Sequence, residues 1–222
     1  MPGKSLESRI DLWNTSAMQI RRIRSVLLVT FALFVGVAYA DWTQIPSSEF
    51  FLPNPPQPGS QAYRRDFEEL RRWQQTRDEK ACALGRAQQA PTVSAFFGPS
   101  SGLLTADEYQ RAEPRLQEIF KFADRIAGYF KTKYHRKRPY DTDRGIVPCV
   151  AKPGGQRAYP SSHAALAAVG ACELAKLYPA KAKRIIDYGA YLGRLRVIVG
   201  VHHPSDVEAG QSLARQICDR LP

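Results

Sequence analysis

The sequence predicts an all-α protein, a single-domain helical bundle with an extended proline-rich arm before it. Beyond residue 60, apolar residues recur at three- and four-residue intervals, as on the buried face of a helix. No segment alternates between apolar and polar residues as a strand does, and no internal repeat is present. The 222 residues fit one domain with one hydrophobic core once a leader is removed.

Residues 1–40 have the features of a secretory signal peptide. A basic stretch at 21–24 precedes an apolar run at 25–40 that closes on Ala-Tyr-Ala, the pattern of a cleavage site. The run is short for a transmembrane helix, which needs about 20 residues, so we expect cleavage; an uncleaved anchor is the alternative. A start at Met18 would give a signal peptide of ordinary length.

Prolines and periodicity divide the rest of the chain. Residues 41–60 contain five prolines and are predicted to form an extended arm, since proline removes backbone donors and fixes φ. Thr105, with Glu108 three residues later, is the expected N-cap of the clearest helix, which should end before or at Arg138-Pro139. The other expected elements are helices at about 61–89, 163–177, 181–199 and 206–221 and loops at 95–102 and 141–159. The first loop is expected to be a packed connector, and a mobile cover over a site is the alternative.

Charge and cysteine content restrict the protein class only loosely. The net charge is +11, and the leader carries +3 of it, which leaves +8. This charge favours anionic partners, although a solvated basic surface explains it equally well. Four cysteines in an exported chain permit two disulfides in any of three connectivities, or buried thiols. No cysteine or histidine spacing suits zinc, so we expect no metal site. The cysteines are Cys82, Cys149, Cys172 and Cys218.

Three of the four histidines and a run of cations supply the groups that phosphoryl transfer needs. Cations can neutralise a phosphate, one histidine can attack phosphorus, and a second can protonate the leaving oxygen. A helix beginning at Ser161 or Ser162 would point backbone N–H groups at an anion, although capping of a core helix is the alternative. Arg138 can hold two phosphate oxygens. Lys131, seven residues earlier, would share its face if the helix extends that far.

The pair His202 and Asp206 is spaced for a histidine oriented by a carboxylate. Four residues make about one helical turn, so the carboxylate could accept a hydrogen bond from one ring nitrogen and leave the other free as a nucleophile. The alternative is an aspartate that starts a helix beside a surface histidine pair. A metal held by His202 and His203 is less favoured, because adjacent side chains diverge. His203 and His135 are given no role.

Taken together, the blocks K-x6-R-P, P-S-S-H and R-x5-H-x3-D resemble the signature of the type-2 phosphatidic acid phosphatase superfamily. The chain is most similar to its bacterial class A non-specific acid phosphatases, which are exported, all-α and independent of metal. The proline-rich arm also resembles that group, so the resemblance covers most of residues 50–221. Vanadium haloperoxidases share the blocks but are usually much larger chains.

By motif position, the resemblance implies a phosphate-binding set made up of Lys131, Arg138, Ser161, Ser162 and Arg196. It also implies that His202 becomes phosphorylated, that His163 acts as general acid and then as general base, and that Asp206 orients His202. Residues 61–222 would then be a periplasmic or secreted acid phosphatase domain acting on a small phosphomonoester. The resemblance implies no cofactor, no nucleic-acid partner and no membrane span after signal cleavage, and it suggests a homo-oligomer.

Two positions depart from the family pattern. Ser162 stands where the family has glycine, which keeps the backbone donor but adds a side chain that can narrow the substrate range. Leu195 stands where the family has serine and cannot make that hydrogen bond. Neither position transfers a proton, so we expect retained activity with altered specificity. The alternatives are a periplasmic anion-binding protein that lost turnover and, less favoured, a vanadium-dependent haloperoxidase.

Overall fold

The computed structural model describes residues 41–155 and 157–222, so the predicted signal peptide and the alternative start at Met18 lie outside the described residues. Residues 43–222 form one unit. Within the described part there are only helices and loops, which confirms the all-α prediction. None of these helices is long and apolar enough to cross a bilayer. The α-helices are α2 (Gln61–Thr76), α3 (Glu79–Ala87), α4 (Val93–Phe97), α5 (Ala106–Tyr134), α6 (Pro139–Thr142), α7 (Ser162–Leu177), α8 (Ala182–Ile198) and α9 (Pro204–Cys218).

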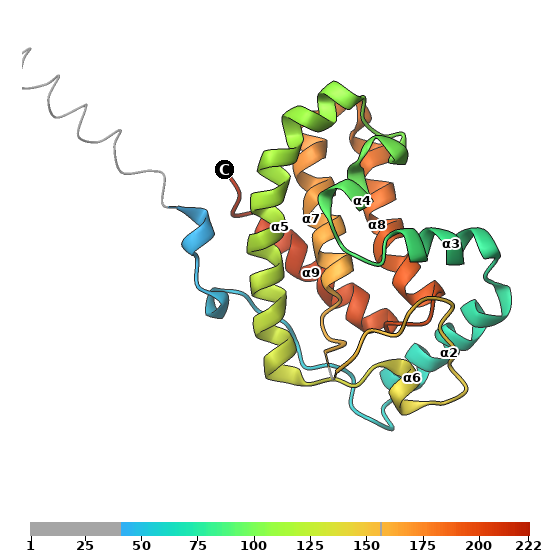
Figure 1. Ribbon diagram of the computed structural model, residues 1–222. Coiled ribbons are helices and arrows are strands. Elements are labelled where there is room, and N and C mark those ends of the chain that lie inside the picture. Colours follow the sequence, from blue (N-terminus) through green and yellow to red (C-terminus); the bar gives the residue numbers. More distant parts are fainter. Residues whose placement is uncertain (1–40, 156) are drawn as a thin grey trace, which may run out of the picture. The chain divides into compact units, whose positions relative to one another are not determined.

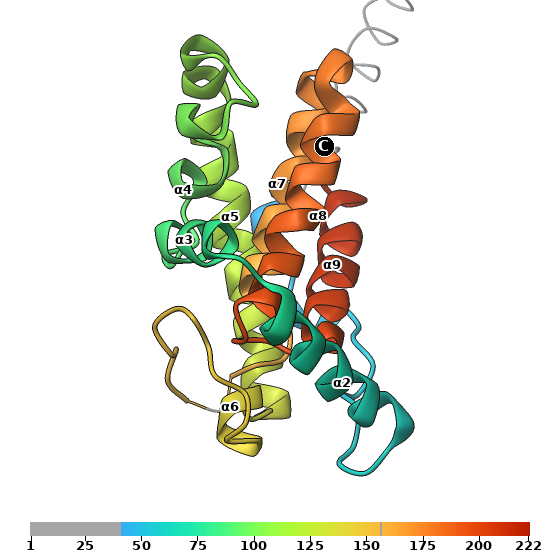
Figure 2. The ribbon, with the colours of Figure 1, turned by 90° about the vertical axis from the view of Figure 1, so that its right-hand side faces the viewer.

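Helix α7 is the centre of the bundle and packs against α5, α8 and α9 (Figures 1 and 2). Its alanine-rich surface is buried along most of its length, as the near absence of charged residues predicts. Small residues allow the close approach of its neighbours. A Cβ on Gly210 of α9 would lie 2.5 Å from the carbonyl oxygen of Ser161, so glycine lets α9 reach the start of α7.

The proline-rich arm lies against its own chain. Two short 3-10 helices, Trp42–Gln44 and Ser47–Glu49, precede a stretch without regular structure. The ring of Phe50 packs edge-on against Phe122 of α5 at 6.0 Å. The Tyr134 hydroxyl donates to the carbonyl of Leu52 at 2.6 Å. These contacts place the arm on the bundle of its own chain.

The helix expected at 61–89 is divided in two. Arg77 adopts an extended ψ of 140°, and Asp78 caps α3 by accepting a hydrogen bond from Ala81 N at 2.8 Å. The Arg77 guanidinium donates to the carbonyl of Val147, 70 residues later in the sequence, at 2.6 Å. The expectation of one continuous helix was therefore wrong, because a tertiary contact and a local cap compete with the helical backbone at this point.

The expected loop at 95–102 is largely helical, so this expectation was also wrong. Thr92 caps α4 through a hydrogen bond from Ala95 N at 3.1 Å, and a 3-10 helix, Pro99–Ser101, follows. Phe96 and Phe97 are fully buried and pack on Phe120 of α5. The segment is a packed connector, and burial of its two phenylalanines stabilises the turn of helix.

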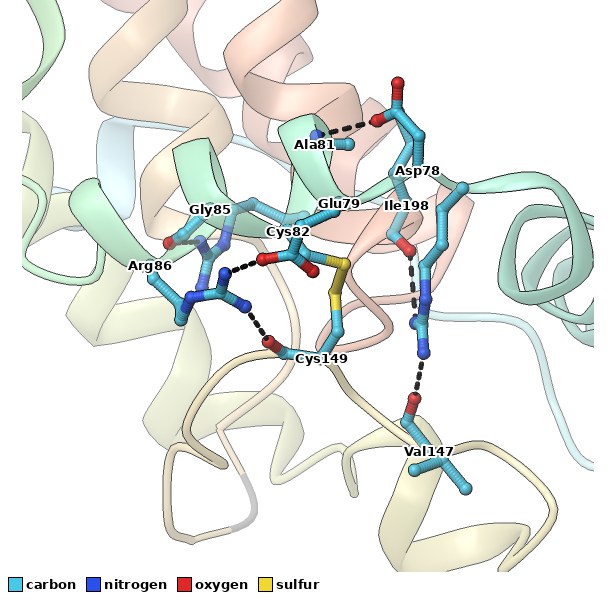
Figure 3. The surroundings of a disulfide bond; sticks show 11 residues. Asp78, Glu79, Ala81, Cys82, Gly85, Arg86, Val147, Cys149 and Ile198 are labelled. Carbon is cyan, nitrogen blue, oxygen red and sulfur yellow. Dashed lines mark hydrogen bonds and ion pairs between the residues drawn. A yellow bond between two sulfur atoms is a disulfide. The ribbon is translucent and has the colours of Figure 1, made fainter.

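The two disulfides join Cys82 to Cys149 and Cys172 to Cys218, with Cα–Cα distances of 5.7 and 6.5 Å. They select one of the three connectivities that the sequence leaves open. The first ties α3 to the long loop after α6 (Figure 3). The second ties α7 to the end of α9.

Candidate active site

A cavity of about 300 Å³ lies where α7 begins and the last turns of α5 pass. Five of the eight predicted site residues line it, and the remaining three, Ser161, Arg196 and Asp206, are buried. Tertiary packing thus brings together residues from three separate parts of the sequence. The lining residues are Pro91, Asp124, Gly128, Lys131, Arg138, Gly154, Arg157, Ser162, His163 and His202.

The ring of His202 is held from both sides. Its Nδ1 lies 3.2 Å from Asp206 Oδ2, and its Nε2 lies 2.7 Å from Arg138 Nη1. Because a guanidinium can only donate, Nε2 must be the unprotonated nitrogen and Nδ1 must carry the proton. Burial and the nearby charge of Arg138 hold the pKa of His202 well below its ordinary value. The ring is therefore neutral, and its lone pair faces the cation.

Asp206 is fully buried and ionised. Burial alone would raise its pKa, but His203, Arg136 and the hydrogen bond from His202 outweigh it and hold the pKa well below the ordinary value. The same carboxylate accepts a hydrogen bond from the backbone N–H of His203 at 2.9 Å and so caps α9. Asp206 therefore starts the helix and also faces the His202 ring, whereas the alternative of a surface histidine pair was wrong, because His202 and His203 are both buried.

Lys131 and Arg138 reach the cavity by different routes. The helix does not extend to Arg138, because α5 ends at Tyr134 and His135 turns the backbone with φ of 45°. Lys131 extends from the last turn of α5 and donates to the carbonyls of Arg157 at 2.7 Å and Pro160 at 2.6 Å. Burial and the charge of Arg138 lower the pKa of Lys131 to about 7.

Two buried arginines each have one N–H group that donates no hydrogen bond to a described residue. The Nε–H groups of Arg138 and Arg196 are buried and have no hydrogen-bond partner among the described residues. Burial and the charge of Arg138 lower the pKa of Arg196 to about 10. A buried donor without a partner is costly, and an anion between the two guanidinium groups would satisfy it.

His163 is the second residue of α7. Its Nε2 lies 3.0 Å from the carbonyl of Gln88, and its ring packs 5.7 Å from that of Phe96. Since a carbonyl only accepts, Nε2 carries the proton and Nδ1 is the nitrogen that can exchange one. Burial, then Arg196, lowers the pKa of His163 to about 3.

Of the two serines at the start of α7, one caps the helix and the other lines the cavity. Ser161 is the N-cap, and its hydroxyl accepts from Ala164 N at 3.3 Å, which is the capping role that was the alternative to anion binding. Ser162, in the place of the family glycine, lines the cavity. Leu195 is fully buried in an apolar cluster with Val199 and Val201, so its departure from serine is accommodated in the core.

A buried polar network behind Asp206 was not predicted. Arg136 donates to Asp206 Oδ1 at 2.6 Å and to Asp66 Oδ2 at 2.8 Å. Asp66, on α2, also accepts from the backbone N–H of Ser205 at 3.0 Å. Arg136 belongs to the basic run before Arg138, so its place in the sequence could have indicated a role near the site. Asp66 is 70 residues away from Arg136 and nothing near it in the sequence indicated this pairing.

His203, which was given no role, contacts the site. Its Nδ1 lies 3.0 Å from Asp206 Oδ2, and its ring is 1% exposed and packs edge-on against Phe67. Setting His203 aside was therefore wrong, because the first turn of α9 folds its ring back onto the carboxylate. His135 is exposed and makes no such contact within the part of the chain that the structure describes.

Comparison with known proteins agrees with this geometry. The model of the PAP2 superfamily matches residues 119–218, which hold all eight predicted site residues. Residues 119–218 form a PAP2 superfamily domain. The PAP2 superfamily is a family of phosphatases, and its matched region contains all three motif blocks of this chain.

Curated relatives of the PAP2 domain are bacterial phosphatases. The chain is 37% identical over 110 residues to an acid phosphatase of Zymomonas mobilis, a match that spans 46% of this chain and 41% of that protein. It is 28% identical over 184 residues to a non-specific acid phosphatase of Salmonella typhimurium, covering 74% and 69% of the two chains. The corresponding protein of Providencia stuartii is 29% identical over 185 residues, covering 79% and 74%.

The fold of the PAP2 domain also matches a solved structure. A crystal structure of a transmembrane PAP2-type phosphatidylglycerolphosphate phosphatase from Bacillus subtilis aligns with a TM-score of 0.53. The identity is 20%, and the match covers 72% of this chain and 85% of that one. This likeness supports the helical fold of the domain.

Proposed function

We propose that this protein is an exported acid phosphatase that hydrolyses small phosphomonoesters through a phosphohistidine intermediate. One observation carries the proposal. His202 presents an unprotonated Nε2 to Arg138 while its Nδ1 faces Asp206, in a cavity that Lys131 and His163 also line. This is the arrangement that a histidine nucleophile needs beside a phosphate-binding cation.

In the first step, the substrate phosphate takes over the guanidinium of Arg138 from the His202 ring and lies between the cations. Nε2 of His202 attacks phosphorus, so a P–N bond forms while the P–O bond to the leaving group breaks. Asp206 stabilises the positive charge that develops on the ring. His163 gives its Nδ1 proton to the leaving oxygen, which departs as an alcohol.

In the second step, water attacks the phosphohistidine. His163, now without its extra proton, accepts one from the water as the P–O bond forms and the P–N bond to His202 breaks. Inorganic phosphate leaves, and both histidines return to their starting states. The negative charge of the bound substrate offsets the charge of Arg196, which raises the pKa of His163 from about 3 and allows its protonation in the complex.

The electrostatics suit an acidic working range. Because the pKa of His202 lies well below its ordinary value, the nucleophile keeps its lone pair at a pH where a free histidine is protonated. Lys131, with a pKa of about 7, carries its charge below neutrality. Acid pH therefore favours a charged phosphate pocket without blocking the nucleophile.

Export is supported by two features of the chain. Residues 1–40 have the pattern of a signal peptide. All four cysteines are paired in disulfides, which persist in oxidising compartments such as the periplasm.

The test is turnover of p-nitrophenyl phosphate by the purified protein in EDTA, between about pH 4 and pH 8. We expect hydrolysis that vanadate inhibits, and a fall of at least about 10³-fold in kcat for His202→Ala. His135→Asn, at the exposed histidine, is the matched control and should keep full activity. Rapid quenching should trap a phosphoenzyme that is labile to acid and stable to base.

Absence of turnover in this pH range would contradict the proposal. Phosphate binding without turnover would instead indicate an anion-binding protein, and halide oxidation with added vanadate would indicate a haloperoxidase. A trapped phosphoenzyme that persists in His202→Ala would rule out His202 as the nucleophile.

A further inference from the structure

Two carbonyl groups at the end of α3 hold residues of the candidate active site, although no α3 side chain is among the described residues that line the cavity. Arg196 Nη1 donates to the carbonyl of Gly85 over a long distance of 3.4 Å. His163 Nε2 contacts the carbonyl of Gln88, the C-cap of α3, at 3.0 Å. The last carbonyls of a helix have no partner within it and are free to accept such bonds.

Helix α3 buries little of its own surface, although Ala81 and Leu84 are half-buried against the cluster around Leu195, and the Gln88 side chain donates to the carbonyl of Ala95 and the hydroxyl of Tyr188. The helix spans nine residues, and only Cys82 and Gly85 within it are buried. Helices this short are marginal without tertiary packing, and an element with few buried apolar contacts opens easily. The orientation of the two carbonyls therefore depends on the few strong attachments that α3 makes.

The main attachment is the Cys82–Cys149 disulfide, surrounded by hydrogen bonds to the same loop (Figure 3). Arg86 Nη1 donates to the carbonyl of Cys149 at 3.2 Å, and Arg77 Nη2 donates to that of Val147 at 2.6 Å. Gln89 donates to the carbonyl of Ala151 at 3.3 Å. Alternate carbonyls of the loop, at 147, 149 and 151, are thus bound by side chains from the α3 region.

The same loop is bound to α8, which carries Arg196. The backbone N–H of Cys149 donates to the carbonyl of Val199 at 3.2 Å. Gly85 is packed so closely that a Cβ there would lie 2.6 Å from Val199 Cγ1 and 3.2 Å from Val150 Cγ1. Glycine is needed at this point because of the close approach between α3 and the end of α8.

We propose that α3, fastened by the Cys82–Cys149 disulfide, positions Arg196 and His163 for phosphoryl transfer. The inference rests on the proposed function and deepens it. The carbonyl of Gln88 keeps the proton on Nε2 of His163, so that Nδ1 faces the leaving group, and the carbonyl of Gly85 limits the movement of the Arg196 guanidinium. Reduction of this one disulfide should therefore lower activity while the bundle stays folded.

The first test compares the two disulfides in the full chain. In Cys82→Ser/Cys149→Ser, we expect kcat for an alkyl phosphate such as glycerol 2-phosphate to fall by about 10-fold to 100-fold. For p-nitrophenyl phosphate, whose leaving group needs little protonation, the fall in kcat should stay below about fivefold. KM should rise for both substrates as Arg196 loses its support.

The matched control is Cys172→Ser/Cys218→Ser, which removes the disulfide between α7 and α9 and should leave both kcat values within about twofold of wild type. Far-UV circular dichroism of both double variants checks that the bundle is folded. Equal losses in the two variants, or an unchanged ratio of kcat between the two substrates in Cys82→Ser/Cys149→Ser, would overturn the proposal.

A second variant keeps the disulfide and moves α3 by its packing alone. Gly85→Ala should push α3 away from Val199 and lower kcat for the alkyl phosphate by about 10-fold. Adding Val199→Ala removes the atom that the new Cβ meets, so Gly85→Ala/Val199→Ala should recover part of the loss. If the double variant is no better than the single one, positioning by α3 is contradicted.

Binding measurements separate this proposal from the proposed function. If wild type hydrolyses no phosphomonoester, the acid phosphatase proposal fails, and titration calorimetry with inorganic phosphate still decides the role of α3. Weaker phosphate binding in Cys82→Ser/Cys149→Ser than in Cys172→Ser/Cys218→Ser would support positioning. If wild type binds no phosphate, the ring ¹⁵N signals of His163 are compared between wild type and Cys82→Ser/Cys149→Ser. Unchanged signals would overturn the positioning role of α3, and shifted signals would support it.

Discussion

Nδ1 of His203 lies 3.0 Å from Asp206 Oδ2, the same oxygen that Nδ1 of His202 approaches to 3.2 Å. A third donor, the backbone N–H of His203, reaches this oxygen at 2.9 Å. Two neighbouring histidines thus share one carboxylate oxygen, which is crowded for an acceptor with two lone pairs. The contact with His203 also helps to keep the pKa of Asp206 low.

Replacement of His203 should change the acid limb of the activity profile. His203→Phe keeps a ring against Phe67 but removes a donor from Asp206, so the pKa of the carboxyl should rise. A carboxylate is lost as the pH falls through its pKa, so the loss of kcat at low pH should begin at a higher pH than in wild type. The measurement is kcat against pH, with His135→Asn as control. Superimposable acid limbs in the variant and wild type would contradict the role given to His203.

Arg136 should matter for stability as much as for activity. It is buried between Asp66 and Asp206, and Arg136→Gln would leave two buried carboxylates without their shared cation. Loss of one partner from a buried ion pair costs about 3–5 kcal/mol. The control is Arg71→Gln, whose ion pair with Asp143 is exposed and should cost at most about 1 kcal/mol.

Urea unfolding followed by circular dichroism measures both Arg136→Gln and Arg71→Gln. Similar unfolding free energies for the two variants would show that the Arg136 network does not stabilise the fold.

The alkaline limb of kcat/KM should report Lys131. Its pKa of about 7 means that the free enzyme loses this cation as the pH rises above neutrality, which weakens phosphate binding. Lys131→Arg should move the limb to higher pH, because a guanidinium stays charged there. Lys133→Arg, at an exposed lysine of the same helix, should leave the limb in place. A limb that does not move in Lys131→Arg would assign it to another group.

Ser162 should influence substrate range more than rate. It lines the cavity at the first position of α7 and replaces the glycine that the resemblance to class A acid phosphatases implies there. Ser162→Gly should raise kcat/KM for a nucleoside monophosphate relative to p-nitrophenyl phosphate by about threefold to tenfold, since one methylene of space is worth about 1 kcal/mol or more. Ser162→Ala keeps the Cβ and serves as the comparison. The same ratio in all three proteins would show that the side chain does not restrict the cavity.

Local sequence signals account for most of the helices. The capping box of Thr105 and Glu108 is present as predicted, because both partners lie within one turn. The interruption at Arg77 was not predictable, since it depends on the carbonyl of Val147, 70 residues away in the chain. The hidden helix at Val93–Phe97 depends on burial of its phenylalanines against α5.

The residue types of the candidate site were evident from the sequence, because phosphoryl transfer needs cations, two histidines and a carboxylate at motif spacing. Tertiary structure alone decided how they are oriented: the proton on His202 Nδ1, the carbonyl of Gln88 that holds His163, and the Arg136 bridge to Asp66. The physical reason is the distance along the sequence over which each interaction acts. Helix caps and apolar periodicity act within a turn or two, whereas a hydrogen bond or disulfide between residues some 70 positions apart exists only after packing has brought the two helices or loops together.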